Sequence, residues 1–338
     1  MSDEGQGNVA VSSESRIAGI WKRLFAFSID SLILGFVGYL LVYLIPEPLA
    51  RLGLWGRSVG FLISLAYFGI GDSALTKGRT VGKLAMDIRV IGANGDPLPV
   101  IKSGLRFVAF GVPFFLNGAP FKIDREWFAL AVGVFLSVCV VGGYLSILYM
   151  LTFNRKTRQS LHDYLVGSFV VQAEGVGAPP ASQLWKGHVA VVACLFAIAT
   201  AAPFLLNELS SAAPFEQMLV VRRAIQSLPA IRYVSLSSGT SKFASTQAGT
   251  KTTNYFSANV ILKGEVENRA ALAECLFGMI FNRYPDVWTK DVVIISVSEG
   301  IDIGIASNWD VKKFQVFQSQ FGPRPDSALP ECQPQRTS

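Results

Sequence analysis

The sequence predicts an α-helical polytopic membrane bundle of about five transmembrane helices, followed by a small soluble α+β domain. Hydrophobic residues make up 51% of the 338 positions and charged residues only 16%, whereas soluble proteins carry roughly 25% charged residues. The apolar residues gather in five runs before residue 207, each near the length of about 20 residues that crosses the hydrocarbon core. After residue 206 the runs give way to shorter segments with helix and strand periodicities.

The five apolar runs cover residues 24–45, 55–75, 105–121, 127–153 and 189–206. The first contains Asp30 as its only charge, and the fourth contains no charge at all. The third is short and is interrupted by Gly111, Pro113 and Gly118, which predicts a tilted or broken span. The five runs predict five helices that cross a lipid bilayer.

Basic residues are distributed unevenly among the segments that connect these runs. Thirteen lie before the first run, between the second and third with Arg106 at the start of the third, and after the fourth, whereas the other two connections hold four, counting Arg57 at the start of the second run. Cytoplasmic loops are enriched in Lys and Arg. We therefore expect a multi-pass protein of the cell inner membrane, with a cytoplasmic N-terminus and an extracytoplasmic C-terminal domain. An even number of spans would place that domain inside.

The chain divides into five predicted parts. They are a disordered tail over residues 1–15, four spans within 16–172, a linker and fifth helix over 173–206, an α+β domain over 207–321, and a disordered tail over 322–338. Within the α+β domain we expect helices over 215–228 and 267–283, and strands over 231–237, 254–262, 292–298 and 301–306. The last two strands are predicted to meet at a tight turn at Glu299 and Gly300, and Asp310 is expected to begin a last helix that ends at Phe317.

The predicted cytoplasmic loop between the second and third spans has a structure signal of its own. Residues 86–91 and 97–101 flank Asn94-Gly95, and Asn-Gly between extended segments is typical of a β-hairpin. We therefore expect a hairpin of these two segments against the membrane face.

The four cysteines predict no disulfide framework. Cys139 and Cys194 lie in apolar runs, where they are expected to pack as inert residues. Cys275 and Cys332 lie in the soluble part and could pair if it faces an oxidising compartment. Their separation, on which pairing depends, does not follow from the sequence.

Asp30 is the strongest candidate for a functional residue. A charge at the bilayer centre costs roughly 2.5–3.5 kcal/mol, so it needs a compensating role. Two interpretations stay open: a site for a proton or monovalent cation, or a structural acid that is neutral or paired. Arg23 lies seven residues earlier on the same helix face, about 10 Å away along the axis, too far for contact. Arg23 is instead predicted to pair with Asp163, which lies beyond the fourth span on the same side of the membrane.

Other motifs favour no catalytic chemistry. The run from Gly78 to Lys83 imitates a phosphate loop, but its spacing is one residue short and Leu84 replaces the required Ser or Thr. His162 stands beside Asp163 without a nucleophile motif. With two His residues and no Cys cluster, a zinc site is not expected. The soluble part has no clustered basic face for nucleic acid. We expect neither an enzyme nor a cofactor.

One short repeat links two of the predicted spans. The first opens with RLFAF at Arg23 and the third with RFVAF at Arg106, and both run from inside to outside. Segments this short support a duplication of helix pairs only weakly. The position that corresponds to Asp30 is Pro113, so the acid is not repeated.

Three ordered segments resemble the RDD family of membrane proteins. They are WKRLFAFSID at residues 21–30, TVGKL at 80–84 with Arg89-Val90 and Asn94-Gly95, and SLHD at 160–163 with Gly167 and Val170-Val171. The family is named after one Arg and two Asp, which map here to Arg23, Asp30 and Asp163; its loop motif maps to Gly82, Lys83, Arg89 and Gly95. The resemblance covers about residues 16–172. It implies a multi-pass and mostly bacterial membrane protein of unsettled function, for which transport of ions or small ligands, including cation/proton exchange, is the usual suggestion.

The sequence thus predicts a transporter of an ion or small solute, with Asp30 as coupling acid. The alternative is a non-transporting membrane anchor or assembly factor whose outer domain binds a partner. Ser31, Gly35 and Gly38 on the first helix would permit close packing in a homo-oligomer.

Overall fold

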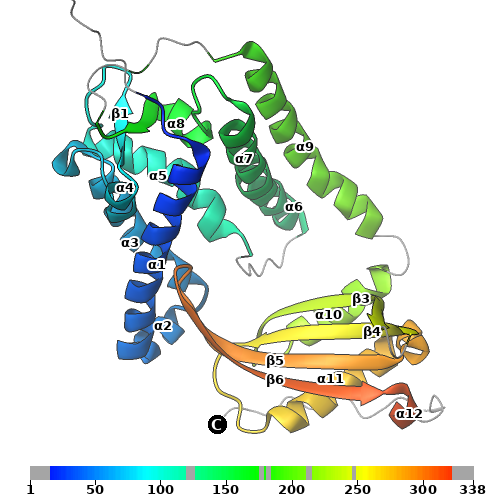
Figure 1. The fold of residues 1–338 in the computed structure, drawn as a ribbon. Coiled ribbons are helices and arrows are strands. Elements are labelled where there is room, and N and C mark those ends of the chain that lie inside the picture. Colours follow the sequence, from blue (N-terminus) through cyan, green and yellow to red (C-terminus); the bar gives the residue numbers. More distant parts are fainter. Residues whose placement is uncertain are drawn as a thin grey trace, which may run out of the picture.

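Figure 1 shows a helical bundle with a four-stranded sheet at one end and a small two-stranded sheet at the other. The computed structural model describes residues 16–118, 126–174, 179, 184–210, 215–245 and 249–321. The two predicted tails, 1–15 and 322–338, lie outside the described residues.

The bundle consists of long apolar helices joined by short ones. They are α1 (Ile20–Leu44), α2 (Pro46–Leu52), η1 (Gly53–Trp55), α3 (Gly56–Gly71), η2 (Ala74–Thr76), α5 (Val100–Leu116), α6 (Glu126–Leu136), the π-helical segment η3 (Ser137–Gly142), α7 (Gly143–Phe153) and α9 (Lys186–Ser210). Three described helices are long and apolar enough to cross a membrane: Ile20–Leu44, Phe128–Phe153 and Lys186–Leu209. The pair α2 and α3, bent by 108°, makes a fourth if it is one span. The membrane bundle is therefore present, whereas the number of about five spans stays a prediction.

The third predicted span is a continuous helix. Helix α5 has 17 residues and runs through Pro113 to Leu116, a length at the short end of the range for a span. The ring of Pro113 fits against Gly143 of α7, where a Cβ atom would lie 2.8 Å from the ring. The proline thus packs against a neighbouring helix instead of breaking its own.

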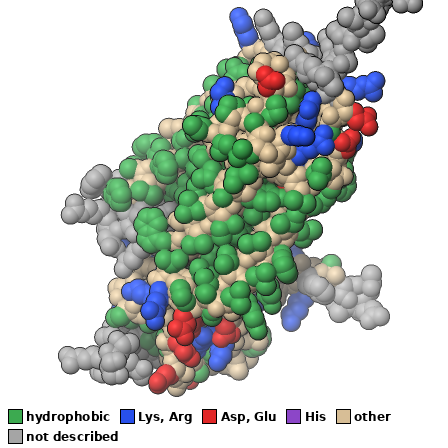
Figure 2. Space-filling model, turned by 90° about the vertical axis from the view of Figure 1, so that its left-hand side faces the viewer, with side chains coloured by type: hydrophobic (Ala, Val, Ile, Leu, Met, Phe, Trp, Pro, Cys, Tyr) green, Lys and Arg blue, Asp and Glu red, His purple; other side chains and the backbone are tan. Residues whose placement is uncertain are grey.

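The outer surface of the bundle is apolar in a way that water would not tolerate. Leu32, Phe36 and Tyr43 of α1 are more than half exposed. Figure 2 shows hydrophobic side chains over the middle of one face, with Lys, Arg, Asp and Glu gathered at its two ends. Soluble monomers rarely expose apolar patches of this extent, so the surface matches the hydrocarbon core of a bilayer.

One end of the bundle carries two short helices and a two-stranded sheet. These elements are α4 (Val81–Ala85), β1 (Ile88–Gly92), α8 (Leu161–Val166) and β2 (Ser168–Gln172). The predicted hairpin of residues 86–91 with 97–101 is wrong, because β1 pairs antiparallel with β2. The turn at Asn94-Gly95 does form, with Gly95 at φ +87°, but the chain after it leads through Pro99 into α5. Burial of both strands under the bundle end selects the distant partner.

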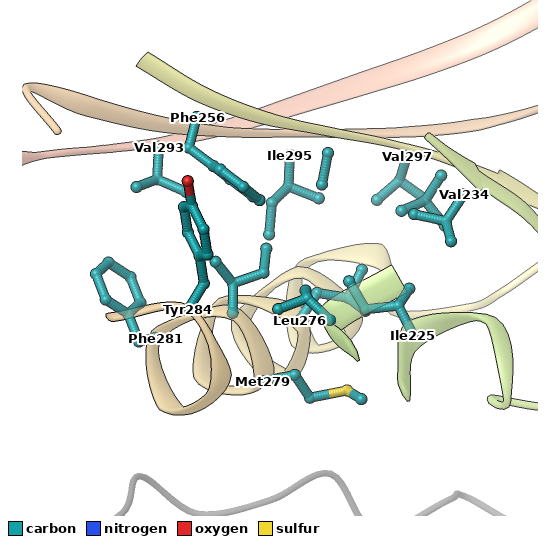
Figure 3. Packing of buried hydrophobic residues seen from close by; sticks show 14 of the residues in the cluster. Ile225, Val234, Phe256, Leu276, Met279, Phe281, Tyr284, Val293, Ile295 and Val297 are labelled. Carbon is teal, nitrogen blue, oxygen red and sulfur yellow. The ribbon is translucent and has the colours of Figure 1, made fainter. Parts of the chain in front are cut away.

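The C-terminal domain packs two helices on one face of a mixed sheet. Its elements are α10 (Phe215–Gln226), β3 (Ile231–Ser245), β4 (Gly249–Leu262), α11 (Arg269–Arg283), η4 (Pro285–Thr289), β5 (Val292–Asp302), β6 (Ser307–Phe317) and α12 (Gln318–Phe321). The strand order is β3-β4-β5-β6, and only the central β4–β5 pair is parallel. Figure 3 shows Phe256 and Ile295 of the sheet pointing towards Leu276 and Tyr284. The predicted α+β domain is present.

Two local predictions in this domain are wrong. Residues 299 and 300 form no turn, because β5 continues through them to Asp302. Residues 310–317 belong to strand β6 and not to a helix. Two tertiary contacts explain the difference: Gly300 lets β6 approach so closely that a Cβ atom would lie 2.1 Å from Asn308 O, and the Asp310 carboxylate binds Arg269 at 2.8 Å instead of capping a helix.

The cysteines divide as their surroundings suggest. Cys139 and Cys194 are free, whereas Cys275 is disulfide-bonded. Cys332 lies outside the described residues, so the prediction of its pairing is not decided.

The tip of the β5–β6 hairpin joins the C-terminal domain to the bundle. Ile303 is fully buried there, in a cluster with Val42 of α1 and Leu49 of α2. Asp302 Oδ2 lies 2.8 Å from Arg57 Nη2 of α3. We define residues 301–306 as the docking tip. It contacts the end of the bundle opposite the β1–β2 sheet (Figure 1). The docking tip and the β1–β2 sheet therefore lie on opposite sides of the apolar middle of the bundle.

Candidate functional site

The carboxylate of Asp30 is fully buried and accepts three hydrogen bonds. Tyr67 Oη donates to Oδ1 at 2.6 Å, and Gly82 N donates to the same oxygen at 2.7 Å. Thr80 Oγ1 donates to Oδ2 at 2.7 Å. Asp30 therefore ties α1 to α3 and to the first turn of α4, where free backbone N–H groups favour a negative charge.

Gly82 is required for this contact. A Cβ atom at this position would lie 2.0 Å from Ala26 O of α1, a backbone atom that cannot move aside. The missing side chain lets the N-terminus of α4 rest directly on α1, within reach of Asp30. This observation gives the loop motif residue Gly82 a physical role.

A chain of buried ion pairs continues from α4 across the bundle. Lys83 Nζ lies 2.7 Å from Asp72 Oδ1, and Arg106 Nη1 lies 2.6 Å from Asp72 Oδ2. Arg106 also reaches Asp163 Oδ1, with Nε at 2.8 Å and Nη2 at 2.7 Å. Arg106 thus bridges two carboxylates from different parts of the chain, Asp72 at the end of α3 and Asp163 in α8. We call Lys83, Asp72, Arg106, Asp163 and Arg23 the charge chain.

Asp163 receives both arginines of the short repeat. Arg23 Nη1 lies 3.3 Å from Asp163 Oδ2, the contact that the sequence predicts. Arg23 also donates to the carbonyl oxygens of Arg158 and Val170. The acid caps α8 as well, because Ser160 N donates to its Oδ2. One side chain therefore joins α1, α5 and α8, and the buried charges balance: Arg23, Lys83 and Arg106 against Asp30, Asp72 and Asp163.

The environment shifts the pKa values of two α8 residues. Burial alone would raise the pKa of Asp163, but Arg106, His162 and Arg23 outweigh it and hold this pKa well below its usual range. Burial lowers the pKa of His162 to about 4, and Arg106 and Arg23 oppose its charge, while Asp163 acts in the other direction. His162 is therefore a neutral imidazole near neutral pH.

The low pKa of His162 predicts a stability that depends on pH. An unfolded chain binds a proton at this residue below about pH 6.5, whereas the folded chain does not until about pH 4. Stability is therefore complete above pH 6.5 and falls as the pH drops towards 4, by roughly 1.4 kcal/mol per unit. We expect His162→Gln to reduce the loss in melting temperature between pH 7.5 and pH 5. An unchanged pH dependence in the variant would contradict this assignment.

The structure brings most of the predicted site residues together. Arg23, Asp163 and Lys83 belong to the charge chain, and Asp30 and Gly82 lie beside it. Two others lie apart: Arg89 pairs in register with Val171 in the small sheet, and Gly95 forms the turn after β1.

Three residues of the site were given no role from the sequence, namely Tyr67, Asp72 and Arg106. Thr80 belongs to the TVGKL segment, but its hydrogen bond to Asp30 was not predicted. Asp72 and Arg106 each lie at the end of an apolar run, where a charge needs no special explanation. The repeat of Arg-x-x-Ala-Phe was the one signal for Arg106, since it placed this residue in the same position as Arg23.

A cavity of about 370 Å³ reaches the charge chain from the apolar side. Its walls come from α1, α5 and α7, and its polar end includes Arg23, Asp30, Asp72, Arg106 and Asp163. The rest of its lining is mainly aromatic and aliphatic. Within the described ranges, no three His, Cys, Asp or Glu side chains gather in a way that could hold a metal ion. The cavity has the size of a small-molecule site, for which about 300–1,000 Å³ is usual.

The apolar spanning helices and the buried charge chain define a polytopic helical membrane protein. Residues 17–167, somewhat under half of the chain, match the model of the RDD family, which confirms the resemblance. The match ends before α9 and the C-terminal domain, so it carries nothing over to them. A comparison with curated proteins gave no match.

Proposed function

We propose that this chain is a membrane transporter, or the membrane subunit of one, that moves an ion or small solute with Asp30 as the coupling acid. The supporting observation is the position of this carboxylate: it lines the cavity and lies against two hydroxyl groups. A hydroxyl group can donate or accept a hydrogen bond. Tyr67 and Thr80 can therefore satisfy either the ionised or the protonated form, as exchange of a monovalent cation for a proton requires.

The proposed orientation places the charge chain towards the cytoplasm of the cell inner membrane. It rests on the excess of Lys and Arg in the segments at that end of the bundle. The disulfide at Cys275 agrees with an oxidising compartment for the C-terminal domain. A cysteine-accessibility measurement on intact cells, with single cysteines at the exposed positions Lys102 and Lys242, tests the orientation. Labelling of residue 102 from outside would contradict it.

The coupling role predicts that Asp30→Asn abolishes transport without loss of folded protein. Asn retains the shape and one acceptor oxygen, so the hydrogen bond from Gly82 N can remain, but it cannot take up a proton. The measurement is the pH change inside proteoliposomes after a pulse of sodium, potassium or lithium. Tyr67→Phe is the comparison variant, because it removes one hydrogen bond to Asp30 and leaves the acid and Thr80 in place, so we expect it to reduce transport without abolishing it. Unchanged flux in Asp30→Asn would leave Asp30 with its structural role at α4.

An anchor or assembly factor is the second candidate function. The docking tip is the observation behind it: its buried contacts join the C-terminal domain to the bundle, and in this proposal the domain serves as a platform for a partner. The two candidates are separated by complementation of a strain that lacks the protein. If deletion of residues 207–338 abolishes complementation and Asp30→Asn retains it, this candidate is favoured over transport.

Two of the three small residues expected at a homo-oligomer contact face the docking tip of their own chain, whereas Ser31 is exposed. Gly38 of α1 faces the docking tip of its own chain, where a Cβ atom would lie 2.9 Å from Ala306 Cβ. Gly35 lies against Ile305 O in the same way. These small residues therefore serve an intramolecular contact.

A further inference from the structure

The cavity opens sideways onto the apolar surface of the bundle. Four of the side chains that line it are also between 38% and 56% exposed on the outside, namely Leu24, Phe27, Phe114 and Leu148. Exposed apolar side chains on membrane helices face the hydrocarbon core of the bilayer. A ligand can therefore enter the cavity from the membrane. Its apolar part would then contact α1, α5 and α7.

The interior of the cavity suits an acyl chain. Phe27 of α1 packs edge-on against Phe110 of α5, with ring centroids 5.3 Å apart. Phe107, Phe114 and Leu151 extend this apolar lining along α5 and α7. Among the lining residues that the structure describes, the charged side chains belong to the Asp30 site and the charge chain, and Tyr144 of α7 adds a hydroxyl group apart from them. The cavity is thus divided into a long apolar part and a charged end.

The charged end has a buried donor that reaches no acceptor, whereas each of its acids is paired. The carboxylates of Asp30 and Asp163 accept hydrogen bonds or ion pairs at both oxygens. Asp72 Oδ1 accepts no hydrogen bond, but it forms an ion pair with Lys83 Nζ at 2.7 Å, and Asp72 Oδ2 pairs with Arg106. In contrast, Arg23 Nε is buried and has no hydrogen-bond acceptor among the described residues. The whole Arg23 side chain is only 10% exposed, so solvent does not supply one readily. An unsatisfied buried donor is costly, so this atom calls for an acceptor from a ligand.

A second arginine contacts Arg23 through its backbone. The Arg158 guanidinium group rests against Gly19, directly before the start of α1. Arg158 O also accepts a hydrogen bond from Arg23 Nη1 at 2.6 Å, which holds the two residues together. Arg158 does not line the cavity, but it adds a positive charge next to a set of buried charges that balance one another. Basic side chains between membrane helices on the cytoplasmic side are typical of sites for acidic lipid headgroups.

We propose that the cavity binds an anionic lipid of the surrounding bilayer, with one acyl chain between α1, α5 and α7 and its phosphate at Arg23 Nε. The site does not depend on transport, because it needs only the side opening, the apolar lining and the unused donor. The experiment therefore measures binding and not flux.

Native mass spectrometry of the purified full chain in detergent tests the ligand class. The probes are dioleoylphosphatidylglycerol, dioleoylphosphatidylcholine with the same chains, oleate, and inorganic phosphate. We expect phosphatidylglycerol to bind about tenfold more tightly than phosphatidylcholine, and phosphate alone to show no binding. Equal binding of the two lipids would overturn the proposal. If oleate binds more tightly than either lipid, the ligand is a fatty acid and not a phospholipid, and the proposal is overturned as well.

Two tryptophan variants test the location. Leu148→Trp fills the mouth of the cavity from an exposed position of α7, and Leu145→Trp adds the same side chain at an exposed position of α7 outside the cavity lining. We expect about a tenfold loss of phosphatidylglycerol affinity in Leu148→Trp and native affinity in Leu145→Trp. Equal affinity in both variants would overturn the location.

A third variant tests the donor. Arg23→Lys keeps a positive charge within reach of Asp163 but removes the Nε donor. We expect weaker binding of phosphatidylglycerol, together with a lower melting temperature in the absence of lipid, because the hydrogen bonds to Arg158 O and Val170 O are lost. Native affinity in this variant would overturn the assignment of the phosphate to Arg23 Nε, and the tryptophan pair shows separately whether the cavity holds the lipid.

Discussion

Arg106→Gln is expected to lose most of its folded protein. Arg106 holds Asp72 and Asp163 together at distances of 2.6–2.8 Å in a buried site. Its removal leaves two buried carboxylates, which lose their shared cation at the point where α3, α5 and α8 meet. Removing one partner of a buried ion pair costs about 3–5 kcal/mol, and here one substitution affects two pairs.

The measurement is the yield of monodisperse protein after detergent extraction, together with its melting temperature. Lys102→Gln is the matched control, because it removes a positive charge from the same helix at an exposed position. Arg106→Lys is expected to lie between the two, since a point charge cannot replace the planar fork that reaches both acids. If Arg106→Gln melts like Lys102→Gln, the charge chain does not hold these elements together.

Gly60→Val is expected to release the docking tip from the bundle. A Cβ atom at Gly60 would lie 1.9 Å from Ile303 O, so α3 and the tip must separate. Within the tip, Ile303 N donates a hydrogen bond to Ala306 O at 3.0 Å, and Ile303 is fully buried. This amide is therefore shielded from solvent in the native chain. Overpacking typically costs about 1–3 kcal/mol. The bundle and the C-terminal domain each have their own core, so we expect this loss of stability to affect mainly the contact between them.

Hydrogen exchange at residues 301–307 checks this expectation. We expect faster exchange there and native protection in β3, β4 and α11, whose core does not include Gly60. Gly35→Ala is the matched control, because its Cβ atom would lie at an ordinary contact distance of 3.7 Å from Ile305 O. Native protection of the tip in Gly60→Val would show that the tip does not depend on this close approach.

The prominence of Asp30 and the Arg23–Asp163 contact could be predicted because they depend on local rules. An acid inside an apolar run is conspicuous, and a snorkelling arginine needs a partner on its own side of the membrane. Arg106 and Asp72 obey the same rules at the ends of their helices, where a charge is unremarkable. Their pairing depends on how α3, α5 and α8 meet, which no periodicity records.

The sequence alone determined the membrane class, the division between bundle and soluble domain, and the family of residues 17–167, because hydropathy and motif spacing act over short stretches of chain. Only the tertiary structure decided the pairing of β1 with β2, the continuation of β5 through Gly300 and the contact of the docking tip with α1 and α3. Those features join segments up to about 250 residues apart, as Arg57 and Asp302 show. Such contacts form where burial and close backbone approach are most favourable in three dimensions, and local propensity then gives way.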